Sequence, residues 1–363
     1  MPIISVIGFF ATLTSRVLAD PVYTVAAIPI PAGLTNTNID GINDLGQVVG
    51  YGNNNSIIQS FISTTQGSMV VTPPSGWDAI VASGINDSGA VVGTGVNSSG
   101  VNQGFTGTTS GITPFPTPNG YTGDALEIYG INDNGQLVGV VLGSQVFIGT
   151  AAGLTTTLQT EFTLFSDINA LSINDSGQIA AWGLNGDVFT AFVSTASGDA
   201  QISPLNGWCN ISALGINDSG QVVGNGFTFT PSPIGNLCTA TQAYIGTAAG
   251  IAAIPLPVGA TVNTVGDGSV NNSGTVVGYS DAGGWIWNAA NGTQLLNLFV
   301  PAGWNITDAI SISNNGLILA EGSYNGGATE YVELATSPEP FTGLLLGSGL
   351  LLLSCVRARR RSR

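Results

Sequence analysis

The side chains that could take part in chemistry are nearly all acids. Of the 363 residues, 21 are Asp or Glu and six are Arg, and there is no Lys or His. The arginines are Arg16 and a C-terminal group, Arg357, Arg359, Arg360, Arg361 and Arg363. Residues 20–340 therefore carry 21 acids and no base, which excludes nucleic acid as a partner because its phosphates need Lys and Arg. Catalytic triads, Schiff bases on Lys and the usual zinc sites are excluded as well.

A pair of carboxylates acting on a glycosidic bond is the enzymatic route that this composition leaves open. The candidates are Glu127, Glu161 and Glu321. Their spacing does not show that any two of them meet, and solvated surface acids would fit the same positions. We therefore expect no enzyme and no catalytic residue, with a carboxylate-only glycoside hydrolase acting on exopolysaccharide as the alternative.

Four aromatic residues stand at equivalent places, each directly after a glycine: Trp77, Tyr121, Trp208 and Trp304. Aromatic planes on one face could stack on sugar rings, while Asn and Asp bind the hydroxyl groups. Packing between neighbouring repeats is the alternative for these side chains, and we favour it.

The residues around these positions form a pattern that recurs seven times, as in GINDLGQVVG at residues 41–50 and GINDSGQVVG at residues 215–224. Its first apolar residue is Ile42, Ile85, Ile131, Ile173, Ile216, Val270 and Ile312, at intervals of 42 to 54 residues. With 52 glycines, the chain suits short strands joined by tight turns. Repeats of roughly 40 to 50 residues in an all-β chain are typical of propeller blades. The sequence thus predicts an all-β, seven-bladed β-propeller.

Each repeat divides into four strand-sized pieces, a to d. Strand a ends at Ile-Asn, and in the turn that follows we expect Asn and Asp to cap their own backbone and a glycine to take positive φ. The turn glycines are Gly46, Gly89, Gly135, Gly177, Gly220, Gly274 and Gly316. Strand b is a short apolar run, and strand c is expected to begin with an aromatic, namely Phe61, Phe105, Phe147, Phe192, Tyr244 or Trp285.

Prolines mark strand d: Pro114, Pro116, Pro204, Pro255 and Pro257. Because proline lacks an amide donor, we expect strand d to be the outermost strand of each blade.

The Asn-Asp turns also suit calcium, which binds carboxylate and carbonyl oxygens. Each turn offers one carboxylate, however, and Asn272 and Asn314 replace it in the last two repeats. Turn chemistry explains the pattern better, so we expect no cofactor and no specific metal site. The acidic surface could still bind calcium weakly.

The two ends of the repeat region complement each other. The seventh repeat stops after strand c, at residues 331–334, while residues 26–33 (AAIPIPAG) nearly reproduce the strand d at residues 252–259 (AAIPLPVG). The N-terminal strand is therefore expected to complete the last blade and close the ring.

The first 19 residues have an apolar stretch and small residues before Asp20. They are typical of a signal peptide cleaved between Ala19 and Asp20, with a first buried strand as the alternative. Export into an oxidising compartment favours a disulfide between Cys209 and Cys238, whereas two separate buried thiols would also fit.

The last residues combine Pro338, Glu339 and Pro340, an apolar stretch at residues 341–356 and the five arginines. This order resembles the PEP-CTERM sorting signal of bacterial surface proteins. The resemblance implies a transmembrane helix with its arginines in the cytoplasm, cleavage near the motif by an exosortase, and release to the cell surface or matrix of a Gram-negative cell. An ordinary permanent tail anchor would give the same topology.

The repeat itself resembles the HAF family of bacterial extracellular repeats, through GIND-x-G-x-V-V-G in copies one, two and five. That family implies export and repetition but no defined chemistry. The expected organisation is a signal peptide at residues 1–19, a propeller at 20–336 and a sorting tail at 337–363. We expect a non-catalytic surface or matrix protein whose propeller binds exopolysaccharide, an envelope protein or cations, or serves a structural role.

Overall fold

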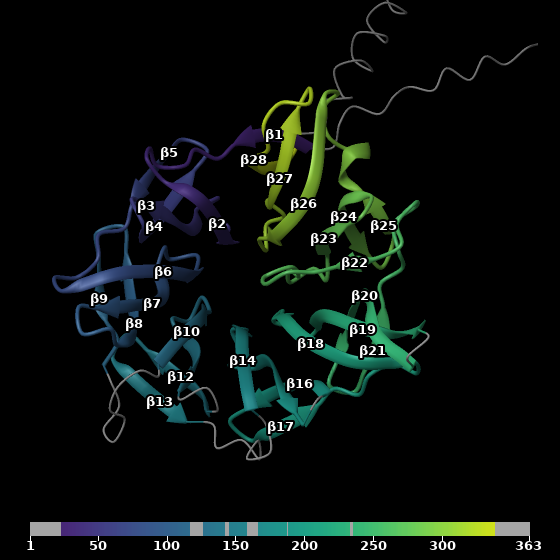
Figure 1. Ribbon diagram of the computed structural model, residues 1–363, viewed down its shortest axis with the longest axis horizontal. Coiled ribbons are helices and arrows are strands. Elements are labelled where there is room, and N and C mark those ends of the chain that lie inside the picture. Colours follow the sequence, from purple (N-terminus) through teal and green to yellow (C-terminus); the bar gives the residue numbers. More distant parts are fainter. Residues whose placement is uncertain are drawn as a thin grey trace, which may run out of the picture.

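The computed structural model describes residues 23–116, 126–141, 145–157, 166–186, 188–232 and 235–337. They form seven four-stranded antiparallel sheets, set as blades around a central channel (Figure 1). The predicted seven-bladed propeller is confirmed. The signal peptide with Ala19 and Asp20, the Pro338-Glu339-Pro340 motif and the predicted C-terminal helix lie outside the described residues. Within the ranges given above, no helix is long and apolar enough to cross a membrane.

In the first six blades the four strands follow the chain from the channel outward, as the repeats predict. Strand a is β2 (Thr35–Ile42), β6 (Trp77–Ile85), β10 (Leu126–Ile131), β14 (Ser166–Ile173), β18 (Trp208–Ile216), β22 (Asn263–Thr264) and β26 (Trp304–Ile312). Strand b is β3 (Val48–Asn54), β7 (Val91–Asn97), β11 (Leu137–Val141), β15 (Ile179–Asn185), β19 (Val222–Ser232), β23 (Val276–Ser280) and β27 (Ile318–Tyr324).

The outer half of each blade contains strands c and d. Strand c is β4 (Ile57–Thr64), β8 (Asn102–Thr108), β12 (Gln145–Thr150), β16 (Val188–Thr195), β20 (Gly235–Thr247), β24 (Gly283–Asn288) and β28 (Glu330–Thr336). Strand d of the first six blades is β5 (Gly67–Val70), β9 (Gly111–Pro114), β13 (Gly153–Thr157), β17 (Gly198–Gln201), β21 (Gly250–Ala253) and β25 (Gly292–Leu295), which a short 3₁₀ helix follows (Leu296–Leu298).

The seventh blade takes its strand d from the start of the chain. Strand β1 (Tyr23–Ala27) pairs antiparallel with β28, from Tyr23 opposite Thr336 to Ala27 opposite Val332. Figure 1 shows this purple strand beside the yellow end of the chain. The predicted closure of the ring is therefore confirmed.

Two details of the blades differ from the prediction. The strand c aromatics lie within the strand, not at its start; β4 begins at Ile57, four residues before Phe61. Pro114 alone of the five named prolines lies in strand d, at its last residue. The other four come after strand d, where a residue without a backbone N–H group limits further pairing with strand c. They therefore mark the end of strand d, not its outer edge.

The turn after strand a requires its glycine. In all seven repeats this residue has φ between 70° and 90°, a region that other residues seldom adopt. The predicted left-handed turn is confirmed.

The core consists of seven apolar clusters between neighbouring blades. In one of them Val49 of β3 packs with Ile80 of β6 and Phe105 of β8. The cluster across the closure contains Ile28 and Leu319 together with Phe61 of the first blade. Burial of apolar area thus holds each blade to its neighbours, including the first to the last.

Candidate binding site in the central channel

A belt of hydrogen bonds joins the blades around the channel. The asparagine that ends strand a reaches the next blade: Nδ2 of Asn43 donates to the carbonyl oxygen of Asn86 at 2.9 Å, and Nδ2 of Asn86 to that of Asn132 at 3.0 Å. The same link joins Asn132 to Asn174, Asn174 to Asn217, Asn217 to Asn271 and Asn271 to Ser313.

These asparagines also cap their own turns, as predicted. Oδ1 of Asn43 accepts the backbone N–H groups of Leu45 and Gln47, at 3.0 and 2.9 Å. A single buried amide therefore both shapes the turn and ties it to the next blade.

The aspartate of the turn behaves differently from the prediction. Instead of capping its own turn, Oδ1 of Asp87 accepts the backbone N–H of Asp44 at 2.8 Å, and Oδ1 of Asp133 accepts that of Asp87 at 2.8 Å. Asn272 and Asn314 accept the same bond through an amide oxygen. This turn position therefore needs a hydrogen-bond acceptor, not a negative charge. Asn272 and Asn314 supply the acceptor as well as an aspartate does, so calcium binding is not needed to explain the pattern.

The closure uses its own version of the belt, because Ser313 stands where the other repeats have asparagine. Here Asn315 donates to Asp44 twice, from its backbone N–H to Oδ1 at 2.9 Å and from Nδ2 to the carbonyl oxygen at 2.5 Å. The hydrogen-bonded circle is therefore complete.

The belt surrounds a cavity of about 430 Å³ whose lining is layered along strand a. Turn carboxylates, among them Asp44, Asp87 and Asp133, form one layer. The next layer is an apolar collar, defined by Ile42, Ile85, Ile131, Ile173, Ile216, Val270 and Ile312. Beyond the collar the cavity is lined by Asp40, Tyr51, Ser83, Tyr129 and Asp267.

A β-bulge in strand a directs three of these side chains. The pairing of β2 with β3 shifts between Ile39 and Gly41, which leaves Asp40 as the extra residue, and equivalent shifts leave Ser83 and Tyr129. A bulge changes the direction in which a side chain points. The repeat pattern gives no sign of it, because the bulged position has no shared residue type.

Two carboxyl groups beyond the collar are electrostatically strained. Oδ1 of Asp40 accepts from Nδ2 of Asn38 at 2.6 Å, whereas its buried Oδ2 has no hydrogen-bond partner. Burial, and secondly the charge of Asp267, raise the pKa of Asp40 to about 7. Asp267 is exposed to the water of the channel, yet the surrounding walls raise its pKa to about 6. The neutral form of each group is thus more stable than in an exposed carboxyl, and a cation bound beside them would favour the ionised form.

Of the three glutamates considered for catalysis, Glu127 and Glu321 lie in different blades. Glu127 in β10 accepts a hydrogen bond from the hydroxyl of Tyr129, Glu321 lies in β27 of the last blade, and Glu161 lies outside the described residues. The acid that does stand beside Glu321 is Asp308, its cross-strand partner in β26. Burial, and then the charge of Glu321, raise the pKa of Asp308 to about 6. No sequence pattern predicts this pair, because strand register joins two residues from different repeat positions.

The loop tryptophans pack within their own blades. A Cβ on Gly226 would lie 1.7 Å from the ring of Trp208, and one on Gly95 would lie 2.1 Å from the ring of Trp77. Trp304 contacts Tyr324, with ring centroids 5.5 Å apart. All three rings are half-buried, and each also packs against an apolar cluster between two neighbouring blades, as predicted. Tyr121 lies outside the described residues.

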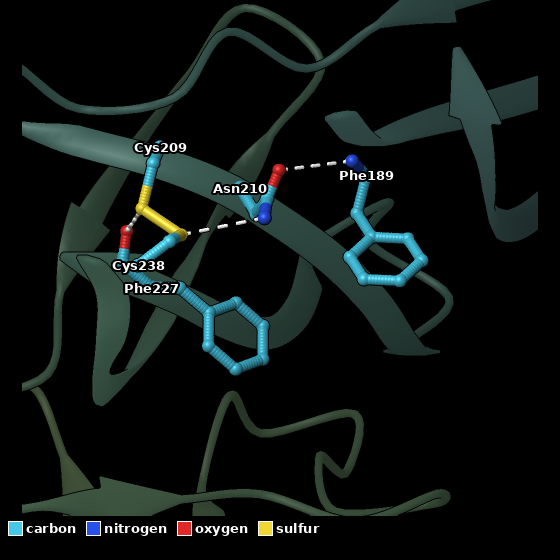
Figure 2. The surroundings of a disulfide bond; sticks show 5 residues. All are labelled: Phe189, Cys209, Asn210, Phe227 and Cys238. Atoms are coloured by element: carbon cyan, nitrogen blue, oxygen red, sulfur yellow. Dashed lines mark hydrogen bonds between the residues drawn. A yellow bond between two sulfur atoms is a disulfide. The ribbon is translucent and has the colours of Figure 1, made fainter. Parts of the chain in front are cut away.

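The predicted disulfide joins Cys209 of β18 to Cys238 of β20, with Cα atoms 6.1 Å apart (Figure 2). Asn210 lies beside it: Nδ2 donates to Sγ of Cys238 at 3.3 Å, and Oδ1 accepts the backbone N–H of Phe189 at 3.0 Å. The bridge thus fastens the long hairpin of β19 and β20 to the inner strand of its blade and, through Asn210, to the preceding blade.

Comparison with known proteins shows the fold alone. No protein-family profile and no curated protein matches the sequence. Among solved structures, the β-propeller domain of the Trilobed protease from Pyrococcus furiosus is similar, with a TM-score of 0.55 and 8% identity over 84% of this chain and 95% of that one. An oligogalacturonate lyase in complex with manganese gives a TM-score of 0.52 and 13% identity, over 89% and 92%.

The acylaminoacyl peptidase of Pyrococcus horikoshii is also similar, with a TM-score of 0.51 and 7% identity over 86% of this chain. The match spans about half of that protein, 53% of its length. These neighbours have different activities, so what this propeller does must be argued from its own residues.

Within the described ranges, no group of three His, Cys, Asp or Glu residues is placed to hold a metal ion.

Proposed function

We propose that this chain is a non-catalytic binding or structural module of the bacterial surface or extracellular matrix. The observation that carries the binding role is the cavity in the channel, which is lined by carboxylates, hydroxyls and aromatic rings and framed by the belt. Residues 20–340 contain no Lys, Arg or His. A site of this composition can hold a ligand through hydrogen bonds and charge without supplying a nucleophile and its base.

Delivery to the surface rests on the two ends of the chain. The signal peptide would direct export, and the expected C-terminal helix would anchor the chain in the membrane. An exosortase would then cleave near Pro338-Glu339-Pro340. A disulfide between Cys209 and Cys238 agrees with an oxidising compartment. The test is to express the full chain with and without an exosortase and to follow it by cell fractionation and C-terminal mass spectrometry. We expect surface release that depends on the exosortase and on the three motif residues; release without either would overturn the sorting role.

A glycan array with the purified full chain, with and without calcium, tests the binding role. We expect signal on neutral bacterial polysaccharides or on an envelope component. Asp40→Asn should change that signal if the cavity is the site, whereas Asp78→Asn, an exposed acid of β6 outside the cavity, should not. Signal equal to background for glycans, envelope extracts and cations would remove the binding role and leave a structural one.

A carboxylate-only glycoside hydrolase stays as a second candidate because of Asp308 and Glu321. A carboxyl group with a raised pKa beside a second carboxylate has the composition of a general acid and its partner. Neither residue lines the cavity, however. Assays for new reducing ends on exopolysaccharide are expected to show none; turnover that Asp308→Asn abolishes would establish the hydrolase instead.

A further inference from the structure

The cavity has two acidic levels separated by an apolar one. Asp40 and Asp267 lie on one side of the collar, and the turn carboxylates of Asp44, Asp87 and Asp133 lie on the other. Asp44 follows Asp40 by four positions in the chain. At about 3.3 Å per strand residue, shortened by the bulge and the turn, the two levels are roughly 10 Å apart.

No positive side chain of the propeller balances these levels, since residues 20–340 contain no base. A channel lined by one sign of charge between low-dielectric walls concentrates the potential and attracts the opposite charge. The ligand that complements the channel is therefore cationic at two places and apolar between them.

The lining favours an organic cation over a metal ion. The side chains of Tyr51 and Tyr129 line the same level as Asp40, and aromatic faces attract ammonium groups. A divalent metal would need six or more oxygen ligands, and within the described part of the chain no three acidic, His or Cys residues are grouped to begin such a site. The isoleucines of the collar have no oxygen or charge that could bind a hydrated ion, whereas their side chains can make apolar contacts with a methylene chain.

We propose that the channel binds a linear aliphatic diamine, with one ammonium group beside Asp40, Asp267 and Tyr51, the methylene chain through the collar, and the second ammonium group among the turn aspartates. This proposal rests on the binding role given above and names the ligand class for it. The two nitrogen atoms of an extended 1,7-diaminoheptane are separated by a distance comparable to that between the two levels.

Isothermal titration of the full chain with 1,7-diaminoheptane, heptylamine and calcium chloride tests the proposal. We expect one diamine per chain and binding of heptylamine at least about tenfold weaker, because it has one ammonium group; tenfold corresponds to about 1.4 kcal/mol. Asp40→Asn and Asp133→Asn should each weaken binding of the diamine about tenfold. Both keep an acceptor oxygen at Oδ1, so the bonds from Asn38 and from the backbone of Asp87 can persist. Asp78→Asn, which removes the same charge from an exposed site, should leave the affinity unchanged.

Three results would overturn the proposal: heptylamine binding as tightly as 1,7-diaminoheptane, Asp78→Asn weakening binding of the diamine as much as Asp40→Asn, or calcium displacing the diamine from a tighter site. Absence of diamine binding beside a positive glycan array would end the diamine proposal and leave the binding role intact. Absence of both signals would end both.

Discussion

The backbone N–H of Ile28 donates to the carbonyl oxygen of Tyr331 at 2.9 Å, which joins the first described strand to the last. The internal blades make the same bond at the same repeat position, from Ile254 to Ala243 at 2.8 Å and from Ile202 to Ala191 at 2.9 Å. The blade assembled from both ends of the chain is therefore built like the continuous ones, and its buried apolar residue has the same role.

Ile28→Ala is expected to destabilise the protein by about 2–5 kcal/mol, the usual cost of truncating a buried isoleucine. Ile254→Ala should cost a similar amount, because both side chains are at most 4% exposed. Denaturant unfolding of the two variants gives the comparison. Val258→Ala, at a residue that is 90% exposed, is the control; if Ile28→Ala proved as harmless as this control, the ring would not be closed in solution.

The belt predicts a contrast between two adjacent residues. Asn132→Ala leaves the backbone N–H of Gln136 without its partner, at about 1–3 kcal/mol for a buried group. It also removes the bond to the next blade at the carbonyl oxygen of Asn174, which keeps the backbone N–H of Gly177 as a donor. Asp133→Asn keeps the acceptor that Asn272 and Asn314 provide in other repeats, and should leave the free energy of unfolding nearly unchanged. Equal losses in thermal melts of the two variants would contradict this division of roles.

The architecture could be predicted because its determinants are local and repeated. Each turn needs a glycine at positive φ, as at Gly46 and Gly316. Because glycine is the residue that adopts this conformation readily, its recurrence in all seven repeats predicts the same turn seven times. The ends were predictable for the same reason, since residues 26–33 copy an internal strand d and its loop.

The candidate site could not be predicted, because it depends on register and on contacts between repeats. Asp40 lines the cavity as the extra residue of a bulge, and Asp308 meets Glu321 through strand pairing. The second contact of each belt asparagine is made to a residue more than 40 positions away, as from Asn43 to Asn86. Periodicity identifies such residues as equivalent without showing what they touch.

Loss of the disulfide is expected to lower stability without opening the ring. The bridge spans a separation of 29 residues, and a loop of this size corresponds to about 3–4 kcal/mol in the chain-entropy description. Dithiothreitol should therefore lower the melting temperature of the protein, and Cys209→Ser with Cys238→Ser should lower it equally. The double variant also serves as the control for dithiothreitol. If the reductant lowered the melting temperature of this variant further, its effect would not be due to the bridge between Cys209 and Cys238.

The acidic interior predicts that the protein becomes less stable as pH rises from about 4 to 8. The pKa of Asp40 is raised to about 7 and that of Asp308 to about 6, and burial also raises the pKa of Glu333. Because the folded state holds these protons more tightly than the unfolded chain, their contribution is complete below about pH 4 and is lost as pH rises through the folded-state values. Melting temperatures across this range should fall steadily, the reverse of ordinary acid denaturation.

Asp40→Asn isolates the largest part of this effect. An amide keeps the acceptor for Asn38 and cannot ionise, so the variant should match the parent near pH 4 and exceed its stability near pH 8. The raised pKa of Asp40 corresponds to a gain on the order of 2–4 kcal/mol at the higher pH. Asp78→Asn removes an equal charge from an exposed position and should leave the slope of the pH profile unaltered. Parallel profiles for the parent and Asp40→Asn would show that this carboxyl group does not titrate between pH 4 and 8 in the folded protein.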